Sequence, residues 1–149
     1  PPGELNRITG PGQHFGFPYL NGSVRIPDYK DMEPPANTVP PVVETVPHAA
    51  DLGLLFYTGS KFPDKYKKGV FTAQHGSWNR TQPVGARVLF TPLNDDGTAA
   101  GEQEEFAVGW LNENGEYVGR PVDLAQLRDG SILVSDDFAG AVYRISYGN

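Results

Sequence analysis

The sequence reads GVFTA at residues 69–73 and RVLF at residues 87–90, and a second pair, ILVS at 132–135 and VYRI at 142–145, repeats the arrangement. Each pair consists of a short strand, a connection and a second strand in which apolar and polar residues alternate. Antiparallel units that recur along a chain in this way are typical of the blades of a β-propeller. A β-sandwich also contains short strands at regular spacing, so the repeat alone leaves both architectures open.

Turn sequences separate the predicted strands. Residues 94–97, 112–115 and 128–130 each end in glycine after Asn or Asp, and such pairs accept the positive φ angles of tight turns. A propeller often completes its closing blade with a strand from the other end of the chain, so a last unit with three strands favours the propeller. The pattern predicts four strands in the first unit and three in the second, near residues 52–57, 69–73, 86–93, 105–110, 122–127, 131–135 and 141–147.

We therefore predict an all-β fold made of β-propeller blades, in a single domain of which this chain is one portion. Within residues 1–149 the expected parts are a blade segment (1–26), a Pro-rich connection (27–48), a four-stranded blade (49–111) and a last blade with three strands (112–149). The 18 glycines and 14 prolines favour short strands and turns over long helices. A flexible linker is the alternative for the Pro-rich connection, although the valines within it indicate that it packs on something.

Composition and missing motifs exclude several classes of function. The formal net charge of −6 argues against a nucleic-acid partner, which normally requires a basic surface. Because the chain has no cysteine, disulfides, thiolate catalysis and cysteine-ligated metals are excluded. No apolar stretch approaches the ~18 residues of a membrane span. The sequence also lacks a nucleophile elbow, a phosphate-binding glycine loop and a His-Glu-x-x-His motif.

Two connections are expected to meet at one mouth of the propeller. If the four strands of a blade are numbered from the propeller axis outward, the loop between the second and third strands lies on one face of the propeller. The loop from the fourth strand to the first strand of the next blade lies on the same face. The first of these loops is residues 74–84, which contain His75, Trp78 and Arg80. The second is residues 112–119, which lead to Arg120 at the start of the next strand. Arginines bind carboxylates in a bidentate manner and an indole stacks on a flat ring, so the group suits a planar polyanion. Each residue also has a plainer interpretation: a structural histidine, a core indole or a surface ion pair.

Several segments resemble the soluble dehydrogenases that depend on pyrroloquinoline quinone (PQQ), most closely the glucose/sorbosone dehydrogenase branch. The resemblance covers most of the chain and is most specific at HGSWNR, residues 75–80. The residues that carry it are ELNR (4–7), HFGFP (14–18), LLFYTG (54–59), HGSWNR (75–80), GRPVD (119–123), DGS (129–131), VSDD (134–137) and VYRISY (142–147).

This resemblance implies a six-bladed propeller that binds PQQ and calcium at one mouth and oxidises a sugar or related aldehyde by hydride transfer to the quinone. Arg120 matches an arginine that contacts PQQ in the family, and His75 falls near the position of a cofactor-facing lysine. Arg80 and Trp78 belong to the motif of the branch itself. The resemblance therefore implies that these four residues bind the cofactor.

Other positions are assigned by the same resemblance. Phe15 and Phe17 stand where the family has aromatic residues near the cofactor or substrate, and Glu4 is a candidate ligand of a structural calcium. Independently of the resemblance, the Asp136-Asp137 pair follows a predicted strand and either binds calcium or, as we favour, simply ends that strand.

The departures from the family are equally informative. The catalytic base and the main calcium-binding loop of the family lie in its N-terminal half, and nothing here matches them. We therefore assign no catalytic residue, and expect the isolated chain to be inactive without the remaining blades. Family members are usually exported, which implies a periplasmic or secreted location. The alternatives are a non-catalytic propeller module that binds carbohydrate or protein, and a purely structural part of a larger assembly.

Overall fold

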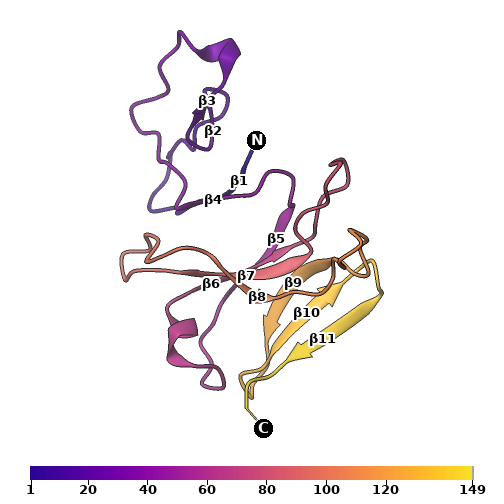
Figure 1. Cartoon of the computed structure of the whole chain (residues 1–149). Coiled ribbons are helices and arrows are strands. Elements are labelled where there is room, and N and C mark those ends of the chain that lie inside the picture. Colours follow the sequence, from indigo (N-terminus) through magenta and orange to yellow (C-terminus); the bar gives the residue numbers. More distant parts are fainter. Residues whose placement is uncertain (149) are drawn as a thin grey trace. The chain divides into compact units, whose positions relative to one another are not determined.

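The structure, a computed structural model, describes residues 1–148 and is built from antiparallel sheets (Figure 1). The chain divides into a first unit, Pro1–Pro47, and a second unit that begins at His48. Helical structure within the described part is limited to two short 3-10 helices, η1 (Pro27–Tyr29) and η2 (Asp64–Lys67). The predicted all-β class is confirmed. Across residues 1–148, no helix is long and apolar enough to cross a membrane.

The first unit contains two small antiparallel pairs. Strand β1 (Gly3–Leu5) pairs with β4 (Val43–Thr45), and β2 (Leu20–Asn21) forms a hairpin with β3 (Val24–Arg25). Strand β4 and helix η1 both fall within the segment predicted as a mostly extended connection. Among the valines of this segment, Val43 lies in β4, and the Val42 N–H donates to the Leu5 carbonyl at 2.8 Å.

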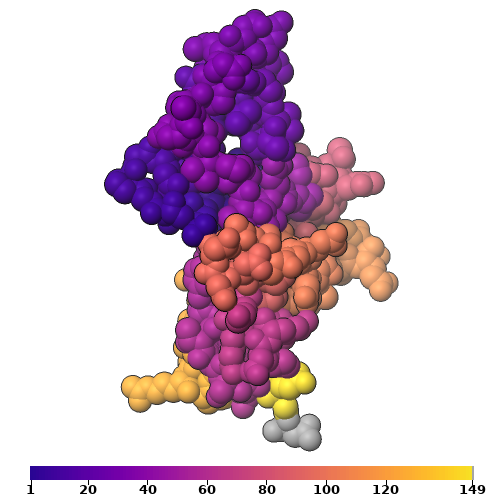
Figure 2. All heavy atoms as spheres, turned by 90° about the vertical axis from the view of Figure 1, so that its left-hand side faces the viewer, coloured from indigo at the N-terminus to yellow at the C-terminus, as the bar shows by residue number. Residues whose placement is uncertain are grey.

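The second unit contains two sheets in which the strands follow chain order (Figure 1). All seven strands predicted from the sequence are present, with ends that differ by a few residues. Residues 93–103 lie at the surface of this unit, shown in orange in Figure 2. The four-stranded sheet is β5 (Asp51–Phe56), β6 (Gly69–Gln74), β7 (Arg87–Pro92) and β8 (Glu104–Ala107); the three-stranded sheet is β9 (Pro121–Gln126), β10 (Ile132–Asp136) and β11 (Ala141–Ile145).

The two sheets pack face to face, because β9 lies against both β5 and β6. Gly53 allows this approach: a Cβ atom at that position would lie 2.5 Å from the Cα atom of Asp123. Aromatic and aliphatic side chains fill the space between the sheets and exclude water from it. The core includes Tyr57, Phe62, Phe71, Ala73, Ala86, Val88, Phe90, Trp110, Leu124, Ile132 and Val134.

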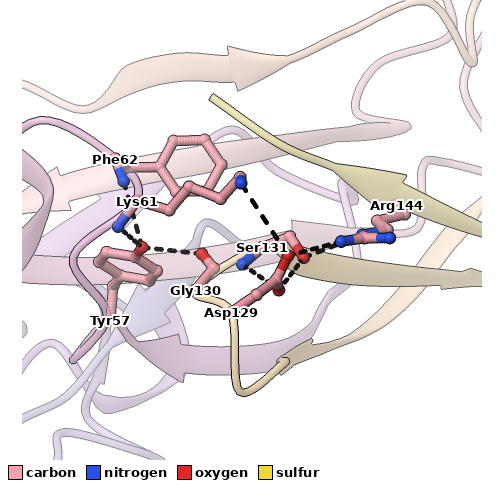
Figure 3. Close-up of polar contacts among 7 residues, drawn as sticks. All are labelled: Tyr57, Lys61, Phe62, Asp129, Gly130, Ser131 and Arg144. Atoms are coloured by element: carbon pink, nitrogen blue, oxygen red, sulfur yellow. Dashed lines mark hydrogen bonds and ion pairs between the residues drawn. The ribbon is translucent and has the colours of Figure 1, made fainter. Parts of the chain in front are cut away.

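A buried tyrosine joins the end of β5 to the β9–β10 turn (Figure 3). The Tyr57 hydroxyl, on a side chain that is 2% exposed, donates to the Gly130 carbonyl at 2.7 Å. The same oxygen accepts hydrogen bonds from the backbone N–H groups of Lys61 at 3.0 Å and Phe62 at 3.2 Å. One hydroxyl therefore satisfies three backbone groups in the β5–β6 and β9–β10 connections.

Replacing Tyr57 with Phe is expected to destabilise the protein by about 2–3 kcal/mol, because it leaves a buried carbonyl and two N–H groups without partners while keeping the ring. Chemical denaturation monitored by tryptophan fluorescence measures this loss. Tyr147→Phe, at an exposed tyrosine, is the matched control and should change the free energy of unfolding by less than about 0.5 kcal/mol. Equal stability of the two variants would contradict a structural role for the Tyr57 hydroxyl.

A second polar group lies beside this tyrosine and surrounds Asp129 (Figure 3). The Ser131 hydroxyl and backbone N–H donate to Asp129 Oδ1, and Arg144 Nη2 lies 2.5 Å from Oδ2. These bonds favour the charged carboxylate. The hydrogen bond from the Ser131 hydroxyl has the largest effect on the pKa of Asp129, followed by that from the Ser131 N–H. Arg144 adds to both, and the pKa falls from 3.8 to about 2.

The lowered pKa predicts an acid-sensitive contribution to stability. A carboxylate whose pKa is lower in the folded state stabilises the fold above its unfolded pKa of 3.8, and this contribution is lost as the pH falls through about 2. Asp129→Asn should therefore be less stable than the parent above pH 3.8, and the difference should shrink as the pH approaches 2. Thermal melts across this range test the prediction, and a difference independent of pH would contradict it.

Candidate functional site

The turn that follows β6 is held against the entry to β5 by backbone hydrogen bonds. The N–H groups of His75 and Gly76 donate to the carbonyls of Ala50 at 2.9 Å and Ala49 at 2.7 Å, respectively. Gly76 has a φ of 98°, and a Cβ atom there would lie 2.7 Å from the Tyr117 ring. Glycine is therefore required at this position, both for its backbone conformation and for the close contact with the aromatic ring.

The Tyr117 hydroxyl closes the loop between β6 and β7. It donates to the Val84 carbonyl at 2.9 Å and lies 2.9 Å from the Ser77 hydroxyl oxygen, which accepts the Val84 N–H at 3.2 Å. The Ser77 N–H also donates to the Val84 carbonyl, at 3.0 Å. Because Tyr117 belongs to the connection between the two sheets, these bonds tie that connection to the loop.

Arg120 organises the same turn from the start of the second sheet. Its Nη1 group donates to the carbonyls of His75 at 3.4 Å and Gly76 at 3.0 Å, and its Nη2 group donates to the Ser77 carbonyl at 2.9 Å. The guanidinium carbon lies 3.9 Å from the centroid of the Tyr117 ring, a cation–π contact. The side chain predicted to reach a ligand therefore also holds three successive carbonyls of the loop.

A buried carboxylate fixes the backbone on which Arg120 stands. Asp136 is 3% exposed, and its Oδ1 atom accepts the N–H groups of Arg120 at 2.9 Å and Ala139 at 2.8 Å. The Tyr143 hydroxyl donates to Oδ2 at 3.1 Å. Burial opposes ionisation, but the hydrogen bonds from Ala139, Arg120 and Tyr143 outweigh it and lower the pKa of Asp136. Of the two roles left open for the Asp136-Asp137 pair, these contacts support the end of a strand for Asp136.

His75 contacts Asp137, the residue that follows Asp136 in the sequence. Its Nε2 atom lies 2.8 Å from Asp137 Oδ1. The histidine side chain is 25% exposed and the aspartate side chain 64%. The turn after β10 therefore reaches the loop after β6. The Asp137 carboxylate lies within hydrogen-bond distance of the His75 imidazole, which was predicted to face the cofactor.

The remaining predicted residues of the second unit are at the surface. Trp78 is 86% exposed, and Arg80 is exposed with its Nε group donating to the Gln82 carbonyl at 3.3 Å. Phe138, which was not predicted, is 60% exposed and lies 6.0 Å from the Arg120 guanidinium. The structure thus brings His75 and Arg120 together and leaves the indole and the second guanidinium exposed on the same loop.

Phe15, Phe17 and Glu4 belong to the first unit. Phe15 is half-buried and Phe17 is exposed. The two carboxylate oxygens of Glu4 accept the Gly22 N–H at 2.7 Å and the Asn6 side-chain amide at 2.9 Å. Within residues 1–148, no three His, Cys, Asp or Glu side chains gather as a metal site would require. The roles predicted for these three residues stay predictions.

Tyr117, Asp136, Asp137 and Phe138 were not selected as site residues from the sequence. A tyrosine after an Asn-Gly turn has no signature of its own, and the sequence favours the end of a strand as the role of the adjacent aspartates. The available signal was topological: both segments follow strands whose ends meet at the same mouth of the fold.

Comparisons with known proteins agree with this architecture. The profile of the TrAA12-like family matches residues 11–148. A protein of Borreliella burgdorferi without an assigned function is 40% identical over 149 residues, which cover 99% of this chain and 39% of that protein. The PQQ-dependent pyranose dehydrogenase of Coprinopsis cinerea is 32% identical over 136 residues, which cover 78% of this chain and 18% of that enzyme. The chain thus spans less than half the length of either relative.

Solved structures give the same result. The holo form of the PQQ domain of the Coprinopsis cinerea pyranose dehydrogenase superposes with a TM-score of 0.61 at 29% identity, over 74% of this chain and 30% of that one. A glucose dehydrogenase superposes with a TM-score of 0.65 at 21% identity, over 98% of this chain and 38% of that one. At that identity the second likeness concerns the fold alone. The resemblance to PQQ-dependent sugar dehydrogenases is confirmed.

Proposed function

This chain belongs to the TrAA12-like family, and we propose that it is part of a PQQ-dependent dehydrogenase that oxidises a sugar or related aldehyde, of the aldose or sorbosone type. In this proposal the loop after β6 and the start of β9 build one side of the cofactor pocket. The main support is that Arg120 donates hydrogen bonds to the carbonyls of residues 75–77, on the same loop as the exposed Trp78 and Arg80 side chains.

The residues of this loop have the chemistry that PQQ requires. PQQ is a planar tricarboxylate, so it needs cations for its carboxylates and aromatic faces for its rings. Arg80 supplies an exposed guanidinium, while Trp78 and Phe138 supply exposed aromatic faces. When bound, PQQ supplies a quinone that accepts a hydride from the sugar carbon.

Arg120 and His75 act in the pocket wall. The positive charge of Arg120 favours an anionic ligand nearby, and its bonds to three carbonyls keep the loop in one conformation before the ligand arrives. A loop that is already ordered binds more tightly, because less conformational entropy is lost on binding. His75 lies on this ordered segment and presents its ring at the edge of the pocket.

Further residues of the enzyme are proposed to have roles of their own. Phe15 and Phe17 are candidates for the substrate side, and Glu4 for a structural calcium, while the catalytic base and the main calcium ligands come from blades outside this chain. The chain by itself should therefore be inactive. Since family members are usually exported, we place the enzyme in the periplasm or outside the cell.

An exposed apolar face supports the need for further blades. Leu52, Leu54 and Phe56 alternate along β5 and are 52%, 48% and 63% exposed, respectively. Apolar side chains in a row on one face of a strand normally pack against another sheet. Because this chain covers only 39% and 18% of its two relatives, we propose that a blade from the remainder of the same protein, or from a partner chain, covers this face.

Activity of the full-length protein tests this function. With PQQ and calcium added, it should reduce an artificial dye in the presence of D-glucose or another aldose. Trp78→Ala and Arg80→Ala together should lower the affinity for PQQ at least about tenfold, since they remove a stacking face and a charge. Lys68→Ala, at an exposed lysine beside the β7–β8 connection, is the control and should leave PQQ affinity unchanged. A full-length protein that binds no PQQ would contradict the proposal.

A non-catalytic, carbohydrate-binding propeller is the second candidate, because an indole that is 86% exposed is also typical of a surface that stacks on sugar rings. Glycan binding that needs no PQQ and survives Arg120→Ala would favour this alternative over the dehydrogenase.

A further inference from the structure

The contact between His75 and Asp137 is not explained by cofactor binding alone. The His75 Nε2 atom lies 2.8 Å from Asp137 Oδ1, and the carboxylate is 64% exposed. Ion pairs as exposed as this contribute little to stability, because water competes for both partners and salt screens their charges. The main effect of the pair is therefore to orient the imidazole ring, and it adds little to the stability of the fold.

Both partners stand on segments that other contacts hold in place. The His75 N–H donates to the Ala50 carbonyl, and its own carbonyl accepts from Arg120. On the other side, the Asp136 carboxylate accepts the Ala139 N–H and so fixes the turn that carries Asp137. With both backbones anchored, the hydrogen bond between the side chains leaves the ring one preferred orientation.

The chemistry of the partner decides which ring nitrogen carries the proton. An ionised carboxylate can only accept a hydrogen bond, so the nitrogen facing it, Nε2, must be the donor. In the neutral ring, Nδ1 then has a lone pair. Among the described residues, Nδ1 of His75 has no hydrogen-bond partner, which leaves it available to a ligand.

We propose that Asp137 is a positioning residue that holds His75 in the Nε2–H tautomer, so that Nδ1 accepts a hydrogen bond from a hydroxyl group of the sugar. The inference rests on the proposed function for the identity of the ligand and on the geometry above for the tautomer. Apart from its pyrrole N–H, PQQ offers a bare Nδ1 lone pair only acceptors, namely its quinone carbonyls and carboxylates, whereas every hydroxyl group of a sugar can donate to it. His75 therefore contacts the substrate from the edge of the cofactor pocket.

The tautomer can be measured directly in the full-length protein. Labelling histidine with ¹⁵N and recording long-range ¹H–¹⁵N correlations distinguishes the two neutral tautomers, and the His75→Gln variant assigns the signals. The parent protein should show the Nε2–H form at His75. Asp137→Ala should give a mixture of tautomers with an unchanged melting temperature, whereas Asp137→Glu should restore the Nε2–H form, because its carboxylate can only accept the hydrogen bond.

Glu113→Ala, which removes an exposed carboxylate on the neighbouring connection, is the matched control and should leave the tautomer unchanged. In dye-linked assays with D-glucose, Asp137→Ala should raise KM about tenfold and change kcat by less than about twofold, because it weakens one substrate hydrogen bond. Asp137→Glu should recover most of that loss.

The inference is overturned if the parent protein shows the Nδ1–H form, or if Asp137→Ala leaves both the tautomer and KM unchanged. Its failure is distinguishable from failure of the proposed function. A full-length protein that binds no PQQ but shows the Nε2–H form at His75, lost in Asp137→Ala, would refute the dehydrogenase while supporting the positioning role of Asp137.

Discussion

The Arg120→Met variant of the full-length protein should bind PQQ about 100-fold more weakly than the parent. Two mechanisms contribute. Methionine removes a positive charge beside the pocket, and it frees the carbonyls of His75, Gly76 and Ser77 from the guanidinium that holds them. Losing charge-assisted bonds worth about 1.5–3 kcal/mol each leaves the loop ordered for only part of the time, and affinity falls with that fraction.

The control for Arg120→Met is Arg80→Met, which removes the same charge from an exposed position on the loop. Hydrogen exchange of residues 75–86, measured by mass spectrometry beside a PQQ titration, separates the two mechanisms. Exchange should become faster in Arg120→Met and stay as in the parent in Arg80→Met, although both bind PQQ less well. Unchanged exchange in Arg120→Met would show that the guanidinium does not order the loop.

The Asp136→Ala variant should lose about 3–5 kcal/mol of stability. Alanine leaves the N–H groups of Arg120 and Ala139 without an acceptor and removes the partner of the Tyr143 hydroxyl. All three groups surround a side chain that is 3% exposed, so water cannot easily replace the carboxylate. Chemical denaturation measures the loss.

Asp136→Asn separates the hydrogen-bond acceptor from the charge at this position. The amide carbonyl still accepts from both N–H groups, and the amide N–H can donate to the Tyr143 hydroxyl oxygen, so this variant should lose only about 1 kcal/mol. If Asp136→Asn were as unstable as Asp136→Ala, the negative charge itself would be the stabilising feature.

The strands could be predicted because their signals are local. Alternation in RVLF at residues 87–90 and VYRI at 142–145, with Asp-Gly and Asn-Gly turns between strands, marks each element within a few residues of its observed position. The turn glycines Gly97, Gly115 and Gly130 have φ angles of 79°, 78° and 83°, which is the conformation that made them informative. Strands β1 to β4 have two or three residues each and are too short for a periodic pattern to identify.

The candidate site was predictable only in part. The order of strands in a blade was enough to bring Arg120 to the loop that carries His75, because topology fixes which connections share a face. It did not predict that the guanidinium would bind backbone carbonyls, since such carbonyls are identical in every sequence. The difference between Asp136, which is buried and accepts three hydrogen bonds, and Asp137, which is exposed and contacts His75, also depends on a strand end known only from the structure.

A crystal structure of the full-length protein with PQQ and calcium is the most direct test of the claim that this chain forms one wall of the cofactor pocket. We predict that PQQ lies against the loop of residues 75–80, with a carboxylate within hydrogen-bond distance of Arg80 or Arg120 and the Trp78 ring beside the cofactor. PQQ bound at a site formed entirely by other blades, with this loop facing solvent, would contradict it.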